Sequence, residues 1–380
     1  MKEFTKSYGL NEIALIPTNK LIDPELVDIS TTIAGLKLEV PVIGSAMDSV
    51  VSPKTAGLLG KQGALGILNL EGVQTRYEDP EEVLHKIASV SKEDYVSLMQ
   101  EIYKEEVKEH LVIKRIQEIK KHGVITAVSS TPQSASRLGP MASEAGADLF
   151  LIQSTVVSNK FQTTSEEKNL NLKEFCKSMP IPVMVGNTTT YEVTYDLIQT
   201  GIKAIFVGIG PGAACTTRGV LGIGVPMATA IVECAAARDK YFEETGNYVS
   251  LIADGGIVNS GDICKALACG ADAVMIGSPI AKAKEAPGKG FHWGMATPNA
   301  VLPRGARIKV GTIASLEEIF HGPSKSDDGS QNFAGAIQTC FATLGVQNVK
   351  EMHDVNVTIA PALQTEGKIY QQAQSLGMYK

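Results

Sequence analysis

Eight short apolar runs recur along the chain, and each of them ends in small or polar residues. Helix-compatible segments such as 52–63 and 134–146 fill most of the gaps between these runs. Strands that alternate with helices are typical of a buried parallel sheet, and eight of them close into a barrel more readily than they form an open sheet. We therefore predict an α/β fold, a (β/α)8 TIM barrel that forms a single catalytic domain over residues 1–380. The predicted strands are 41–46, 64–68, 124–130, 148–154, 182–187, 204–209, 250–256 and 273–278.

Two segments depart from this alternation. Residues 73–121 follow the second strand, are rich in Glu and Lys, and are called the excursion below. Its charge pattern predicts a helix from Lys92 to Lys121, solvated on one side and packed on the barrel rim or on a neighbouring subunit. Residues 287–335 follow the eighth strand and are irregular, so we predict a lid or flap at the carboxyl end of the barrel.

Charge and cysteine content narrow the class of partner. The net charge of -6 is spread along the chain, which leaves no basic stripe for nucleic acid or an anionic membrane. The six cysteines lack CxxC spacing, which disfavours a zinc site and a disulfide framework and favours a reduced, cytoplasmic location. No signal-like start or bilayer-length apolar run is present, so we expect small-molecule partners and no membrane.

The strongest candidate for chemistry is the loop after the sixth strand, which reads GIGPGAACTTR over residues 208–218. Its glycines permit positive φ angles and expose the thiol of Cys215 on the catalytic face of the barrel. A cysteine at such a tip, flanked by hydroxyl groups and Arg218, can act as a thiolate nucleophile. For the other five cysteines we keep the usual interpretation of a small buried apolar residue.

The loops after the seventh and eighth strands carry a second signal, ADGGI from Ala253 and MIGS from Met275. In TIM barrels these two loops commonly bind phosphate through backbone N–H groups, and glycine lets the ligand approach closely. Asp254 is an acceptor placed to hold a ribose diol. The pairing of the two loops therefore predicts a nucleotide site.

With PVIGSAMDSV from Pro41, these motifs resemble the diagnostic segments of the IMP dehydrogenase / GMP reductase family, over about residues 8–72 and from Val124 to the C-terminus. The resemblance implies that Cys215 adds to C2 of the purine and forms a covalent thioimidate, with Thr217 as its catalytic partner. It implies that the backbone carbonyls of Gly208, Gly210 and Cys215 bind potassium, and that the protein is a homo-oligomer, a tetramer or an octamer. The implied cofactor contacts are Gln153, Ser154, Thr155 and Asn187. The implied nucleotide contacts are Met47, Asp254, Gly255, Gly256, Gly277, Ser278, Gly294, Met295, Arg304 and Gly305.

Departures from the family pattern bear on the reaction. The excursion stands where the family usually carries its regulatory CBS module, so the chain resembles a CBS-less bacterial branch of the family. Ala213 replaces a phosphate-binding serine, which removes one hydrogen bond worth about 0.5–1.5 kcal/mol. The flap lacks the Arg-Tyr pair with which IMP dehydrogenases activate water. The chain's only such pair, Arg76-Tyr77, lies in the excursion and is interpreted as a surface turn. At the position of the reductase's flap Glu stands Arg304, so the partner of Thr217 is unidentified.

The missing water-activating pair favours a GMP reductase, which converts GMP to IMP and ammonia with NADPH. Two alternatives stay open. One is an IMP dehydrogenase, which makes XMP from IMP with NAD and water, and the other is a non-catalytic nucleotide-binding regulator.

Overall fold

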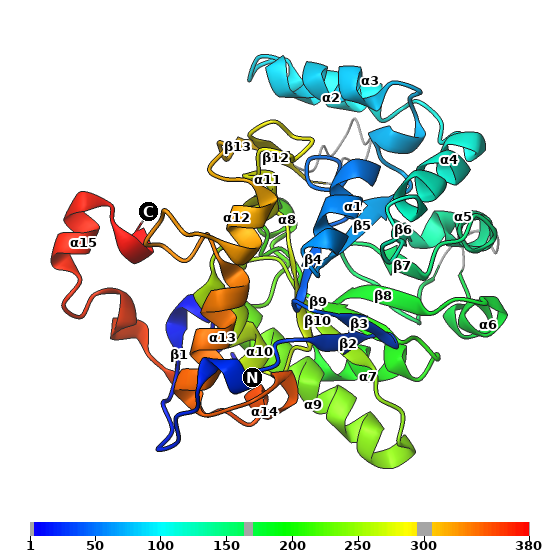
Figure 1. The fold of residues 1–380 in the computed structure, drawn as a ribbon. Helices are drawn as coiled ribbons and strands as arrows, with labels where there is room; N and C mark the ends of the chain where they lie inside the picture. The colour runs from blue at the N-terminus through cyan, green and yellow to red at the C-terminus, as the bar shows by residue number, and fades with distance from the viewer. Residues whose placement is uncertain (1–3, 163–169, 295–305, 380) are drawn as a thin grey trace.

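The computed structural model describes residues 4–162, 170–294 and 306–379. Eight parallel strands close into a barrel in the order β10-β11-β4-β5-β6-β7-β8-β9, with helices outside it (Figure 1). Each predicted apolar run holds one strand, so the prediction of a (β/α)8 TIM barrel is confirmed. The barrel strands are β4 (Val42–Gly44), β5 (Leu65–Asn69), β6 (Ala127–Ser130), β7 (Leu149–Gln153), β8 (Val183–Thr188), β9 (Ala204–Val207), β10 (Ser250–Asp254) and β11 (Ala273–Ile276).

The outer helices form where the sequence supplies caps and an apolar face. The helix after β4 begins at Ser52, whose hydroxyl accepts from the amide of Thr55 while Pro53 takes the first turn. The helix after β10 begins at Asn259, which caps the amide of Asp262. These connecting helices are α1 (Pro53–Lys61), α5 (Pro132–Glu144), α6 (Leu172–Ser178), α7 (Tyr191–Ile198), α8 (Thr217–Leu221), α9 (Met227–Thr245), α10 (Ser260–Ala268) and α11 (Ser278–Ala281).

A β-hairpin closes the amino-terminal end of the barrel. Its strands, β2 (Thr31–Ile33) and β3 (Leu36–Leu38), are joined by Ala34 and Gly35, both at positive φ, as a tight two-residue turn requires. Ile33 and Leu38 are buried in one cluster with barrel-interior side chains such as Phe206 and Ile252. The barrel is therefore a filled core, and any site must lie at its ends.

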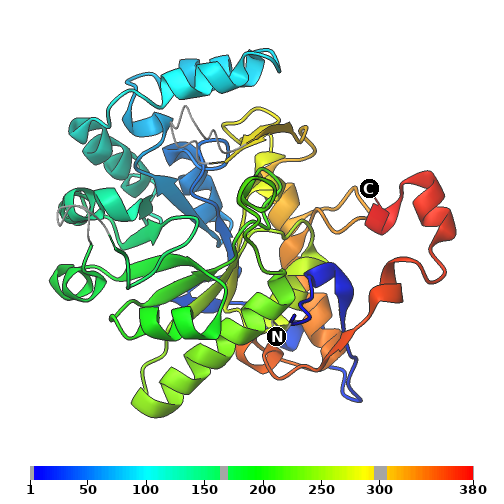
Figure 2. The same ribbon diagram turned by 180° about the vertical axis from the view of Figure 1, so that it is seen from behind.

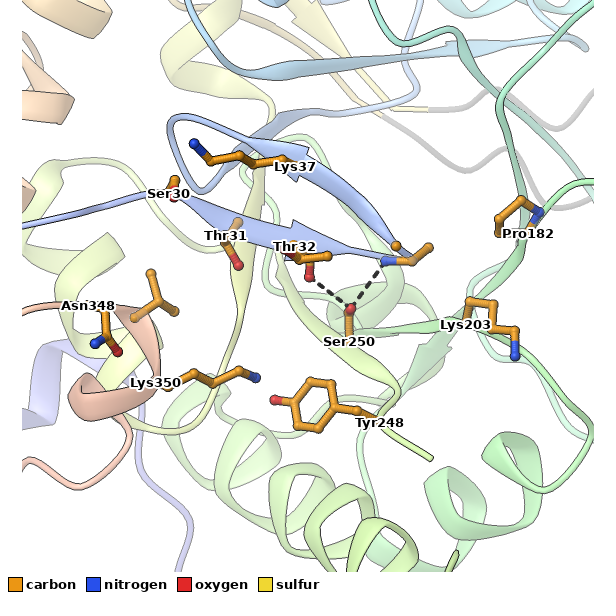
Figure 3. A pocket seen from close by; sticks show the side chains of 13 residues that line it. Ser30, Thr31, Thr32, Lys37, Pro182, Lys203, Tyr248, Ser250, Asn348 and Lys350 are labelled. Carbon is orange, nitrogen blue, oxygen red and sulfur yellow. Dashed lines mark hydrogen bonds between the residues drawn. The ribbon is translucent and has the colours of Figure 1, made fainter. Parts of the chain in front are cut away.

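Outside this hairpin lies a pocket of about 610 Å³, shown in Figure 3. Ser250 begins β10 at its wall and hydrogen-bonds the hairpin through Ala34 N and Thr32 O. Lys203, Tyr248 and Lys350 also line it. Because it sits at the amino ends of the barrel strands, this pocket lies opposite the predicted nucleotide site.

The excursion holds three helices, α2 (Pro80–Ser89), α3 (Tyr95–Ile102) and α4 (Glu109–Lys120), which follow a 3-10 turn η3 (Val73–Thr75). The prediction of one helix from Lys92 to Lys121 is therefore wrong. Helix α3 ends at Tyr103, whose side chain is buried among residues of the excursion and the flap, and Lys108 N then donates to Thr75 O before the next helix begins. Tertiary contacts override local propensity here.

The flap region begins with an antiparallel hairpin, β12 (Phe291–Trp293) and β13 (Arg307–Lys309), which lies beside the excursion in both ribbon views (Figures 1 and 2). Next come α12 (Leu316–His321), α13 (Phe333–Leu344) and α14 (Val349–Met352). The final described elements are β14 (Val357–Ile359), η5 (Pro361–Gln364), α15 (Ile369–Gln374) and η6 (Gly377–Tyr379).

A strand near the amino-terminal end of the chain pairs with a strand near the carboxyl-terminal end. Strand β1 (Ile13–Leu15), between the 3-10 turns η1 (Leu10–Glu12) and η2 (Pro24–Leu26), pairs antiparallel with β14. Beyond β14, α15 stands away from the barrel in both views (Figures 1 and 2). In the described residues, no helix combines the length and the apolar character needed to cross a bilayer.

Candidate active site at the carboxyl end of the barrel

The nucleophile loop leaves β9 through glycines that no other residue could replace without strain. Gly208 has a φ of 147°, and a Cβ there would lie 2.2 Å from the carbonyl oxygen of Asp254. Gly210 has a φ of 79°. The loop thus brings Cys215 to the surface of the barrel end, where its side chain is exposed, as the sequence predicts.

The contact of the thiol is a hydroxyl group rather than a guanidinium. Cys215 Sγ lies 3.2 Å from Oγ1 of Thr217, whose side chain is buried at the start of α8. Arg218, predicted to flank the thiol, instead donates from Nη2 to the carbonyl of Val225 at 3.1 Å. The expected catalytic pair Cys215 and Thr217 is therefore in contact, and the part predicted for Arg218 is not supported by its hydrogen bond.

The predicted ribose contact and two predicted cofactor contacts form one hydrogen-bonded network. Asp254 Oδ2 accepts from Asn187 Nδ2 at 2.8 Å and from Gln153 Nε2 at 2.9 Å. Gln153 also donates to Asn187 Oδ1 at 3.1 Å. Burial raises the pKa of Asp254 to about 6, although both amide donors act in the opposite direction. This carboxyl therefore titrates close to neutral pH.

The other predicted cofactor residues lie beside this network. Ser154 and Thr155 follow β7 and are half-buried. The amide of Ser154 donates to the carbonyl of Gly186, and the amide of Asn187 donates back to Ser154 at 3.0 Å. The ends of β7, β8 and β10 thus meet as predicted.

The two loops that are predicted to bind the nucleotide phosphate, after the seventh and eighth barrel strands, lie close together. Gly255 and Gly256 both have positive φ angles, and the amide of Gly255 donates to the carbonyl of Met275, which ties the seventh loop to the eighth strand. Gly277 leads into α11 at Ser278, and a Cβ on Gly277 would lie 3.5 Å from the sulfur of Met47. The first strand's loop therefore faces the eighth, as a shared nucleotide site requires.

Of the flap residues predicted to bind nucleotide, Gly294 ends the first described leg and is half-buried. Met295, Arg304 and Gly305 lie outside the described residues. The chain continues at Ala306, whose amide donates to the carbonyl of Ala214 at 3.2 Å. The second leg of the flap therefore contacts the residue that precedes Cys215.

Sequence reasoning missed His292 and Ser49. Nδ1 of His292 lies 3.0 Å from the Ser49 hydroxyl, and its ring would be 2.9 Å from a Cβ on Gly277. Burial lowers the pKa of His292 to about 4, so the ring is neutral at physiological pH. The sequence did offer one signal for His292, because it stands next to the chain's single tryptophan. Its contact with Ser49 could not be predicted, because the two residues are 243 positions apart in the sequence.

Arg76 and Tyr77 do not form a surface turn, which corrects that interpretation. Arg76 donates to the carbonyls of Glu71 and Glu105, and the Tyr77 hydroxyl donates to the carbonyl of Ile102 at 2.9 Å. Both side chains are half-buried. The pair fastens the excursion to the end of β5.

The carbonyl group of Gly208 accepts from Asn187 Nδ2 at 2.8 Å. A carbonyl oxygen has a second lone pair, so the potassium site expected at the carbonyls of Gly208, Gly210 and Cys215 stays a prediction. No step below depends on potassium.

Comparisons with known proteins identify the family to which the chain belongs. A family model described as "IMP dehydrogenase / GMP reductase domain" matches residues 7–300. An uncharacterised oxidoreductase of Mycolicibacterium smegmatis is 37% identical over 93% of this chain and 96% of its own length. An inosine-5'-monophosphate dehydrogenase of Cryptosporidium parvum is 32% identical over 92% and 91%.

Among solved structures, an IMP dehydrogenase/GMP reductase-like protein from Corynebacterium glutamicum superposes with a TM-score of 0.88 at 36% identity. The match covers 94% of this chain and 95% of that one. On its fold, its motifs and these matches, the chain belongs to the IMP dehydrogenase / GMP reductase family of oxidoreductases.

Proposed function

We propose that this protein is an IMP dehydrogenase that oxidises IMP to XMP through a thioimidate on Cys215. The thiolate forms a bond to C2 of the purine, the hydride of C2 leaves to NAD, and water then adds to C2 as the thiolate departs. We assign proton exchange at the reacting carbon to Thr217, and its contact with Cys215 Sγ supports this assignment.

The charge of the flap is the observation that favours the dehydrogenase reaction over the reductase reaction. Residues 287–311 contain Arg304 and Arg307 but no Asp or Glu. A reductase of this family uses a flap Glu with the second threonine of the CTT motif to protonate departing ammonia, and residues 287–311 contain none. A dehydrogenase needs a group that stabilises developing hydroxide, and a guanidinium can do so by its charge.

The two arginines are not equivalent. Arg307 donates to the carbonyls of Ile87 at 2.5 Å and Val90 at 2.9 Å, so its guanidinium is engaged with the excursion. We therefore assign the activation of water to Arg304. We assign the nicotinamide dinucleotide to Gln153, Ser154, Thr155 and Asn187, at the ends of the fourth and fifth barrel strands.

The test is a paired assay on purified protein. NADH formation is followed with IMP and NAD, NADPH consumption is followed with GMP, and ammonia and XMP are quantified. We expect XMP formation that is lost in Arg304→Ala and retained within about twofold in the matched variant Lys309→Ala, which removes an exposed positive charge from the same segment. Electrostatic stabilisation of this kind contributes about 10²–10³-fold. XMP formation at an undiminished rate in Arg304→Ala would overturn the assignment of Arg304.

The second candidate is a GMP reductase that uses NADPH, and the observation in its favour is the lack of an Arg-Tyr pair in the flap. It predicts NADPH consumption with GMP, release of ammonia, and no XMP. Tight nucleotide binding without turnover in either assay would instead indicate a nucleotide-binding regulator.

A further inference from the structure

The excursion and the flap share one hydrophobic core. Trp293 of β12 is 1% exposed and is buried among Val83, Leu84, Ile87, Met99 and Ile102 of α2 and α3. Arg307 of β13 lies 4.6 Å from the ring centroid of Phe291 and 5.5 Å from that of Tyr95, besides its bonds to the carbonyls that end α2. Both described legs of the flap are therefore held by the excursion.

One side chain of the excursion reaches past this core to the barrel. The hydroxyl of Tyr103, which is 3% exposed, donates to Oδ2 of Asp48 at 2.6 Å and accepts from Nε1 of Trp293 at 3.2 Å. The amide of Val73 also donates to Asp48 Oδ2, at 3.0 Å. Tyr103 thus joins the excursion, the flap and the loop after the first barrel strand at one oxygen atom.

The buried carboxyl group of Asp48 has few hydrogen-bond donors besides the Tyr103 hydroxyl. Its side chain is 4% exposed, and its Oδ1 is buried without a hydrogen-bond partner in the described structure. A buried carboxylate is tolerated only where donors compensate for lost water, and bonds to a charged acceptor are the strong ones. Tyr103 is the only side chain that donates to Asp48 in the described residues, so its loss would leave the carboxyl group with backbone donors alone, the amides of Val73 and Gln74.

The residues on either side of Asp48 belong to the active site. Met47 faces Gly277, and the hydroxyl of Ser49 contacts His292 Nδ1 at 3.0 Å. A displacement of Asp48 would therefore move Met47 and His292 relative to the loop that begins at Gly277.

We propose that Tyr103 is a positioning residue of the active site, which fixes the Met47–Ser49 loop and the first leg of the flap through Asp48 and Trp293. The proposal rests on the proposed function only in placing the nucleotide at this end of the barrel, and it holds for either direction of the reaction. It gives the excursion a part in nucleotide binding and turnover.

The experiment compares Tyr103→Phe with Tyr77→Phe. The control removes a hydroxyl from the same region, one that donates to a backbone carbonyl and not to Asp48. We expect Tyr103→Phe to weaken nucleotide binding and to lower kcat/KM by about tenfold or more, as the loss of one hydrogen bond to a charged acceptor implies. Tyr77→Phe should change neither by more than about twofold. Trp293, the only tryptophan, should show red-shifted emission in Tyr103→Phe alone.

Asp48→Asn and the variant that combines it with Tyr103→Phe complete a double-mutant cycle. A positioning role through Asp48 predicts that Tyr103→Phe has a much smaller effect on nucleotide Kd in the Asp48→Asn background. A merely structural role would lower the melting temperature while leaving kcat, KM and Kd of the folded protein unchanged, and that outcome would overturn the proposal. If the wild type turns over neither nucleotide, the proposed function fails, while calorimetric Kd values and Trp293 emission still decide the part played by Tyr103.

Discussion

Nucleotide affinity should depend on pH through Asp254. Burial holds the pKa of this carboxyl at about 6, and only the ionised form can accept hydrogen bonds from both hydroxyls of a ribose diol. As pH falls through 6, protonation removes that acceptor, so affinity is fully present above this pKa and is lost below it. If the protonated form does not bind, Kd at pH 5 is about tenfold higher than at pH 7.5, equivalent to about 1.4 kcal/mol.

The assay is calorimetric titration of GMP and IMP between pH 5 and pH 8. The nucleotide phosphate itself titrates with a second pKa of about 6, so the profile of Asp254→Asn serves as the control. This variant keeps the phosphate contribution and lacks the carboxylate. The difference between the two profiles should show the inflection near pH 6.

The amide side chains that contact Asp254 provide a second test of this prediction. Asn187 and Gln153 donate to Asp254 Oδ2 and lower its pKa. Gln153→Ala should therefore move the inflection to higher pH, because one donor that favours the ionised form is lost. Coincident profiles for the wild type and Asp254→Asn would refute the reasoning and would show that the ribose is held elsewhere.

Three further outcomes are expected. Cys215→Ala should abolish turnover while nucleotide binding persists, and 6-chloropurine ribotide should label the native protein once per subunit; labelling of another cysteine together with activity in the variant would contradict this. Burial lowers the pKa of His292 from 6.5 to about 4, so stability should fall as pH drops from 6.5 to 4, by up to about 1.4 kcal/mol per pH unit, with a shallower slope in His292→Asn by urea denaturation. Ile33→Ala should destabilise the fold by about 2–5 kcal/mol in the same assay, because this side chain closes the barrel interior, and a loss below about 1 kcal/mol would contradict that packing.

The barrel could be predicted because its signal is local and repeated. Each strand is a short apolar run, and helix caps such as Ser52 and Asn259 stand next to the helices that they begin. The nucleophile loop and Asp254 could be predicted for a related reason, since the carboxyl ends of parallel strands meet at one end of a barrel.

The missed features depend on contacts between distant residues. Tyr103 ends a helix because it meets Asp48, 55 positions earlier, and Trp293, 190 positions later. Nothing in the Glu- and Lys-rich pattern around Tyr103 encodes those partners, so a single long helix was the local prediction. The barrel-closing hairpin did carry a signal, because Ala34 and Gly35 separate two alternating triplets, although its position beneath the barrel follows only from the burial of Ile33 and Leu38.

The pairing of β1 with β14 also has a consequence for synthesis of the protein. Ile13 pairs with Ile359, so the amino-terminal strand leaves the ribosome long before its partner exists. At about 5–20 residues per second, the intervening chain takes about 17–70 s to translate. Throughout that interval β1 is an unpaired strand with open backbone donors and acceptors, the kind of edge to which other nascent chains can add. The barrel strands can assemble earlier, whereas the pairing of β1 waits until Val357–Ile359 have been translated, so premature termination before Val357 would leave β1 permanently unpaired.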